Sequence, residues 1–181
     1  MKRKLIAVLL AGLMALSSGA CGSNSEDKKG QNKTETGKVP EKKEVYFKDD
    51  VLKIENATIK ITNVEIIPPD TELGETNPSI AITYEFTNTS DELMKPFDPW
   101  LACFRATQEL ESTVVELYSG SLPDNETYNA LRDMAYTDVK PGATVQAVEC
   151  YEIKDTTRPV TLTARQGAGG KELGTKVIEL Q

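Results

Sequence analysis

The sequence predicts an all-β fold, a β-sandwich of about seven or eight short antiparallel strands. The clearest observation is residues 79–88, where large apolar side chains occupy every second position. These side chains are Ile80, Ile82, Tyr84 and Phe86. An alternation of period two is typical of a strand with one face on a core and one on water. The second observation is that similar short runs recur across residues 45–181, separated by turn-forming residues, as in sandwiches.

Two strands are expected before residue 79, at 51–56 and 57–67, after ordered structure begins at 45–47. In the longer strand, two apolar pairs lie on opposite parities. The pairs are Ile59 with Ile61, and Val64 with Ile66. A slip of one residue near Thr62 and Asn63 would turn both pairs toward the core, so we predict a β-bulge there.

Further strands are expected after the central one, together with one helix. The strands are residues 100–107, 109–117, 143–153, 158–165 and 175–180. In the first of them, Trp100, Ala102, Phe104 and Ala106 would share a face. The break at 118–138 contains Tyr128, Leu131 and Met134 at helical spacing, which predicts a short helix.

The N-terminus has the pattern of an export signal. Three basic residues precede an apolar run at 5–16, which is too short to cross a bilayer, and small residues at 17–20 lead to Cys21. This arrangement resembles the lipobox of bacterial lipoproteins, in which the cysteine is lipidated and becomes the first residue. We therefore expect a lipoprotein signal peptide at 1–20 and a lipidated Cys21. The alternatives are a buried helix, a transmembrane anchor and a secreted protein cleaved near Ala20.

Residues 21–44 are expected to form a flexible tether carrying the lipid. They contain one aliphatic residue, Val39, and no aromatic residue, so they cannot bury enough surface to offset the entropy of ordering. The remaining residues, 45–181, would form the sandwich. The chain has a net charge of −7, and removal of the three basic residues of the leader would leave −10. Such a surface repels nucleic acid, so a nucleic-acid partner is not expected.

Three segments of the predicted sandwich resemble one family. They are Ile-Thr-Tyr-Glu-Phe-Thr-Asn-Thr-Ser-Asp-Glu at 82–92, Phe-Arg-Ala-Thr-Gln-Glu-Leu at 104–110 and Asp-Val-Lys-Pro-Gly-Ala-Thr at 138–144. Together they are similar to the immunoglobulin-like domain of uncharacterised cell-surface lipoproteins of Gram-positive Firmicutes, a domain of unknown function. The resemblance covers roughly residues 45–165. It implies an immunoglobulin-like sandwich at the extracytoplasmic face of the cell membrane, and it supplies no catalytic residues.

Two cysteines remain if Cys21 is lipidated, namely Cys103 and Cys150. Outside the cytoplasm such a pair usually forms a disulfide. Each cysteine, however, lies on the parity opposite to its apolar neighbours, which places both outside the core. An outward pair can bond only if the two strands are neighbours in one sheet. The sequence therefore leaves both a disulfide and two free thiols open.

The chain contains no histidine, which excludes Ser-His-Asp and Cys-His catalysis and imidazole metal ligands. Acidic residues are plentiful, and most are expected to form a solvated surface. They include Asp70, Glu72, Glu75, Asp91, Glu92, Glu109, Glu111, Asp124 and Glu126. We therefore expect no catalytic site, no metal site and no cofactor.

The expected function is that of a membrane-anchored lipoprotein with a non-catalytic binding or accessory domain. Its partners would be the membrane, through Cys21, and an unknown protein or cell-envelope ligand. The candidate contact surface gathers aromatic residues of the type enriched at binding hot spots, which could instead cap the core. They are Phe97, Trp100, Tyr118 and Tyr128. The alternative functions are a carboxylate-dependent hydrolase and a calcium-binding surface module.

Overall fold

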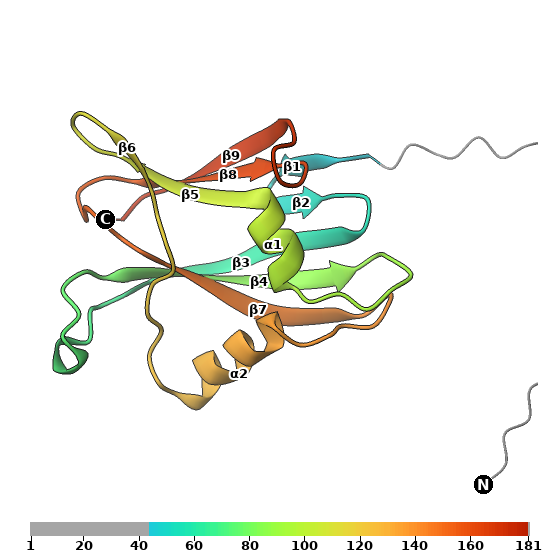
Figure 1. Cartoon of the computed structure of the whole chain (residues 1–181), viewed down its shortest axis with the longest axis horizontal. Coiled ribbons are helices and arrows are strands. Elements are labelled where there is room, and N and C mark those ends of the chain that lie inside the picture. Colours follow the sequence, from blue (N-terminus) through green and yellow to red (C-terminus); the bar gives the residue numbers. More distant parts are fainter. Residues whose placement is uncertain (1–43, 181) are drawn as a thin grey trace, which may run out of the picture. The chain divides into compact units, whose positions relative to one another are not determined.

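The computed structural model describes residues 44–180, which form two antiparallel β-sheets and three short helices (Figure 1). The first sheet has the order β1-β2-β3-β4-β7, with bounds β1 Tyr46–Lys48, β2 Val51–Lys53, β3 Ala57–Ile67, β4 Ser79–Asn88 and β7 Thr144–Glu152. The second has the order β6-β5-β8-β9, with bounds β6 Val114–Glu116, β5 Phe104–Glu109, β8 Val160–Arg165 and β9 Glu172–Ile178. The helices are η1 Thr71–Leu73, α1 Phe97–Cys103 and α2 Glu126–Ala135. The predicted all-β sandwich is confirmed.

The predicted signal peptide, the lipidation site at Cys21 and the tether up to residue 43 lie outside the described residues. Within residues 44–180, no helix has the length and apolar character needed to cross a bilayer.

β4 lies in the interior of the first sheet, between the middle strand β3 and the edge strand β7, and its alternation predicted the face that it buries. It pairs with β3 on one side and with β7 on the other, and its four large apolar side chains are fully buried. The register with β3 shifts between Ile61 and Asn63, which confirms the predicted bulge. The extra residue turns both apolar halves of β3 toward the same sheet face. Ile59 and Ile61 are buried there and Val64 packs against the core, but Ile66 is 42% exposed, so the second pair enters the core only in part.

The core lies between the two sheets and takes apolar side chains from both. Leu52, Ile59 and Phe86 come from the first sheet, and Ala106 and Leu162 come from the second. The structure has nine strands among its described residues, slightly more than the seven or eight predicted. Three of them, β1, β2 and β6, span only three residues each, which is too short to carry a readable alternation.

The segment 100–107 is not a single strand, so that prediction was wrong. Its first part belongs to helix α1, and β5 begins only at Phe104. Pro96 is the N-cap of this helix and Pro99 lies in its first turn. Proline is tolerated at both positions because backbone N–H groups there make no intrahelical hydrogen bond. Trp100 and Cys103 are three residues apart, so the helix turns both into the core. A short apolar run fits both periodicities, and packing decides between them.

The predicted helix in the 118–138 break is confirmed as α2. Asn125 caps it by accepting a 2.9 Å hydrogen bond from the Tyr128 N–H. Figure 1 shows α2 beside β7, on the side away from the second sheet. There it covers a second, smaller apolar cluster that contains Ala81 and Val148, and Leu131 of α2 packs against it.

Candidate functional site

The candidate site is a cleft of about 370 Å³ beside β7, the edge strand of the first sheet. We call it the β7 cleft. Its walls come from η1, the segment 119–122, the C-terminal part of α2 and β7. Its lining includes Leu73, Leu122, Arg132, Tyr136, Val148, Glu149 and Cys150.

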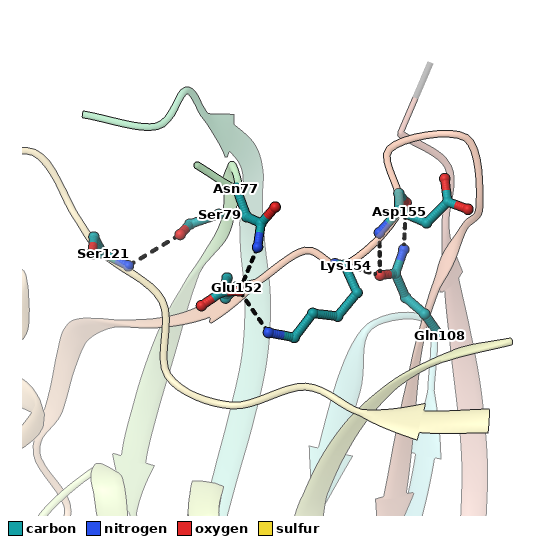
Figure 2. Close-up of polar contacts among 7 residues, drawn as sticks. All are labelled: Asn77, Ser79, Gln108, Ser121, Glu152, Lys154 and Asp155. Carbon is teal, nitrogen blue, oxygen red and sulfur yellow. Dashed lines mark hydrogen bonds and ion pairs between the residues drawn. The ribbon is translucent and has the colours of Figure 1, made fainter. Parts of the chain in front are cut away.

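The segment 119–122 forms its wall by running directly along β7. The Gly120 N–H donates to the Cys150 carbonyl at 3.0 Å, and the Ser121 N–H donates to Ser79 Oγ at 3.0 Å (Figure 2). A Cβ on Gly120 would lie 2.7 Å from the Tyr151 carbonyl carbon. Only glycine therefore permits this close backbone approach.

A polar network fixes the neighbouring end of β7 (Figure 2). Glu152 Oε1 accepts hydrogen bonds from Asn77 Nδ2 at 2.8 Å and from Lys154 Nζ at 2.5 Å. The Lys154 ammonium, followed by the Asn77 amide, lowers the pKa of Glu152. Because Asn77 belongs to the connection from η1 to β4, these bonds tie that connection to β7.

Glu149 is the chemically unusual residue of the β7 cleft. Its Oε1 is shielded from water, and neither this atom nor the buried Tyr84 hydroxyl makes a hydrogen bond of good geometry within the described residues. The Tyr84 hydroxyl nevertheless lies beside the carboxyl and favours its charged form. Burial outweighs that effect and raises the pKa of Glu149 to about 7.

Glu149 was not among the residues predicted for a site, although its position in the strand carries a signal. Glu149 shares the parity of Ala147 and Tyr151, which were expected to face the core. A carboxylate at an inward position of a strand is costly unless it is paired or can be protonated. It therefore marks a candidate site more strongly than the exposed acidic residues do.

Replacing Glu149 by glutamine should stabilise the protein at about pH 8, by about 1–3 kcal/mol, and have little effect near pH 4. The folded-state pKa of about 7 lies above that of an exposed glutamate, so the folded state holds the proton more tightly. The stabilisation from that proton is complete at low pH and is lost as the pH rises through 7. Thermal unfolding of both proteins across this range measures the difference, and an equal slope in both would contradict it.

Arg132 and Tyr136 add a cation and an aromatic ring to the β7 cleft. Tyr136 is 53% exposed, and its ring packs on Phe97 with centroids 4.8 Å apart. Arg132 Nη2 donates to Asn129 Oδ1 at 2.8 Å, and among residues 44–180 no ion pair involves Arg132. Burial, followed by the Glu149 charge, raises the pKa of the Tyr136 phenol, and Arg132 lowers it. The charges of Glu149 and Arg132 therefore both act on the pKa of the Tyr136 phenol.

Cys150 also lines the cleft, but its thiol is not activated. Burial is the main cause that raises its pKa to about 12, and Sγ donates to the Ser121 carbonyl at 3.3 Å. A thiol in this environment stays protonated at neutral pH and is a poor nucleophile.

The disulfide between Cys103 and Cys150, which the sequence left open, is not formed, since both are free thiols. The parity argument predicted that Cys103 faces outward, and this was wrong. Cys103 lies in helix α1 and packs into the core between the sheets. Cys150 follows its predicted parity and lies on the other face of the first sheet, opposite Ala81. The sheet therefore separates the two.

The predicted aromatic contact surface is not formed as one patch. Trp100 is only 1% exposed and packs on Tyr84, so its assignment to a binding surface was wrong. Phe97 is half-buried against Tyr136, and Tyr128 is half-buried with its hydroxyl donating to Glu65 Oε2 at 2.8 Å. Tyr118 is 72% exposed. Of the four, Tyr118 alone presents most of its surface to solvent.

Among residues 44–180, no three His, Cys, Asp or Glu side chains come together in a way that could hold a metal ion.

Residues 32–166 match a family model described as "Domain of unknown function (DUF5067)". The fold is similar to that of a Staphylococcus aureus protein described as a "putative lipoprotein", with 22% identity, a TM-score of 0.67, and coverage of 76% of this chain and 92% of that one. It is also similar to a protein from Enterococcus faecalis, with 16% identity, a TM-score of 0.61, and coverage of 75% and 93%. No curated protein matches the sequence.

Proposed function

The chain belongs to the DUF5067 family, a domain of unknown function, and from that premise we propose that it is a lipid-anchored, extracytoplasmic binding protein. Cys21 would hold it on the outer face of the cell membrane, and the β7 cleft would bind a ligand without catalysing a reaction. The order of basic, apolar and small residues before Cys21 supports the anchor. The lipoprotein description of the Staphylococcus aureus structure supports the location.

Replacing Cys21 by serine should release the protein from the membrane fraction, because the acyl chains on its thiol would be the attachment. Cell fractionation and detergent partitioning of the variant and the parent measure this. Replacement of Ser25 by alanine is a matched control close to the same position and should leave the attachment unchanged. Equal partitioning of the Cys21 variant and the parent would refute the lipid anchor.

The observation that supports binding is the chemistry of the β7 cleft. Leu73 is 79% exposed and Tyr136 is 53% exposed, and both line the cleft together with the polar residues Arg132 and Glu149. Apolar walls with a few polar groups inside are typical of small-molecule sites.

A carboxylate-dependent hydrolase is the second candidate, because Glu75 lines the same cleft as Glu149, whose pKa is raised. General acid–base hydrolysis needs two carboxyl groups on either side of one reacting bond. Glu75 Oε2, however, accepts a 2.9 Å hydrogen bond from the Asp70 N–H. This carboxylate therefore stabilises the loop at 70–75. Burial and Tyr84, not a second carboxylate, set the pKa of Glu149. The geometry therefore supports binding better than hydrolysis.

Ligand binding should raise the melting temperature of the full chain, since a ligand that binds only the folded state stabilises it. Small-molecule fractions of a cell-envelope extract, added to the protein in detergent, provide the test. Tyr136→Ala and Leu73→Ser should abolish the increase. Leu101→Ser, at a residue that is 65% exposed and does not line the cleft, should retain it. An increase that survives both cleft variants would place binding elsewhere.

A further inference from the structure

We propose that the segment 119–122 is a pH-controlled strap on β7, closed while Glu149 carries a proton and released when Glu149 ionises. Release lets water from the β7 cleft reach the Glu149 carboxyl. It also changes the shape of the cleft, because this segment is one of its walls. The device operates whether or not the cleft binds a ligand.

Glu149 is an inward-facing carboxyl on an edge strand. β7 is the last strand of the first sheet, and Glu149 lies directly opposite Ile82 of β4, which is fully buried in the core. Directly opposite residues of an antiparallel pair share one face of the sheet, so the Glu149 side chain starts out toward the core. Its Oε1 is shielded from solvent and makes no hydrogen bond of good geometry among the described residues. A neutral carboxyl tolerates such a place far better than a carboxylate does.

No neighbouring cation compensates an ionised Glu149 among the described residues. Titratable groups near it come from β4, β7, α2, the residue after α2 and the end of the η1 loop, namely Tyr84, Cys150, Tyr151, Arg132, Tyr136 and Glu75. Helix α1 adds the uncharged Trp100, and Glu116 of β6, which acts on Tyr151, pairs with Arg105. Arg132 forms no ion pair with Glu149, and the Tyr84 hydroxyl favours the carboxylate less than burial opposes it. Ionisation therefore leaves a shielded charge without a counter-ion.

The segment 119–122 is the part of the surroundings that can yield. The Gly120 N–H donates to the carbonyl of Cys150, the residue next to Glu149, and the Ser121 N–H donates to Ser79 Oγ (Figure 2). The Ser121 carbonyl accepts from Cys150 Sγ at 3.3 Å. Both residues line the same cleft as Glu149, so their movement uncovers the carboxyl from the cleft side. A connection held by a few hydrogen bonds at a sheet edge opens more readily than the core.

The direction of the effect follows from proton binding. Burial raises the pKa of Glu149 from 4.5 to about 7 in the closed form, and hydration returns it toward the lower value. The closed form therefore holds the proton more tightly, and its advantage is complete at low pH. Each pH unit between these two values favours the released form by about tenfold, and above pH 7 the effect no longer grows.

Amide hydrogen exchange of the full chain in detergent, resolved by residue with NMR, tests this at about pH 5 and about pH 7.5. The reporters are the Gly120 and Ser121 N–H groups, which are donors in the closed segment, and the Leu162 N–H in β8, which is paired on both sides. Protection factors remove the intrinsic effect of pH on exchange. We expect those of Gly120 and Ser121 to lie well below that of Leu162 and to fall about 10- to 100-fold between the two pH values.

Glu149→Gln should abolish the fall, keeping the protection of both reporters within about twofold at the two pH values. Tyr84→Phe removes the hydroxyl that favours the carboxylate, so the fall should continue up to about pH 8.5, where the parent no longer changes. A purely structural role would not move this pH profile. Glu85→Gln is the matched control. Glu85 follows Tyr84 on β4 and points to the opposite face, so this variant should show the fall of the parent.

Equal protection of Gly120 and Ser121 at the two pH values would overturn the proposal, and so would a fall of the same size in Glu149→Gln. Protection as high as that of Leu162 would also overturn it, because water would then reach Glu149 only when the whole domain unfolds. The proposed function is judged separately, by whether the envelope extract stabilises the parent protein but not Tyr136→Ala.

Discussion

Replacing Trp100 by alanine should lower the free energy of unfolding by about 3–5 kcal/mol, the range for truncating a buried aromatic residue. Trp100 is 1% exposed and stacks on Tyr84 with ring centroids 4.4 Å apart. It also packs on Phe104 at 4.5 Å, and its Nε1 donates to the Tyr151 hydroxyl at 2.7 Å. Alanine would leave a cavity where α1, β4 and β5 meet, and it would remove the donor to Tyr151.

Chemical denaturation followed by far-UV circular dichroism measures this, since Trp100 is the single tryptophan and its fluorescence is lost in the variant. Trp100→Phe keeps a ring in the core and should cost about 1–3 kcal/mol, which separates packing from the lost hydrogen bond. Tyr118→Ala, at an exposed aromatic residue, should stay within about 0.5 kcal/mol of the parent. If Trp100→Ala lowers the free energy of unfolding no more than Tyr118→Ala does, packing of the indole does not stabilise the core.

Replacing Gln108 by leucine should cost about 2–4 kcal/mol, although the two side chains are similar in size. Gln108 is fully buried on β5, and its side chain makes hydrogen bonds to the backbone of the connection from β7 to β8 (Figure 2). Nε2 donates to the Asp155 and Arg158 carbonyls at 2.8 and 2.9 Å. Oε1 accepts from the Lys154 and Asp155 N–H groups at 2.8 and 3.1 Å. Leucine would leave these four backbone contacts unmade where the chain crosses between the two sheets.

Gln146→Leu is the matched control for this change. Gln146 lies on β7 with its side chain exposed, so the same substitution there should change stability by no more than about 0.5 kcal/mol. Hydrogen exchange of residues 153–159 adds a local measurement, and Gln108→Leu should speed it up more than Gln146→Leu does. Unchanged exchange there would show that the loop is held by other contacts.

Local patterns predicted the strands well where each strand was long enough to show its period. Residues 79–88 alternate over ten positions, and β4 has those bounds. The conflict of parity around Thr62 predicted the bulge in β3, because two apolar pairs can share a core only if the register shifts. The helical spacing of Tyr128, Leu131 and Met134 predicted α2.

The prediction was wrong where a short apolar run fitted two periods. Trp100, Phe104 and Ala106 are all buried, as a strand would place them, but Trp100 reaches the core from a helix. That single misassignment also reversed the predicted orientation of Cys103. A window of four residues holds one helical turn or two strand repeats, and the neighbouring chain decides which one packs.

The spacing of apolar residues predicted the two-sheet class, strand β4, the bulge in β3 and the existence of helix α2. Each depends on the spacing of apolar residues along one segment, and burial of one face acts on that spacing directly. Tertiary packing forms the β7 cleft, which brings together residues as far apart as Leu73 and Cys150. It also decided that Glu149 is shielded and that Arg132 has no ion pair among the described residues, because desolvation and charge depend on neighbours in space, which a linear pattern does not specify.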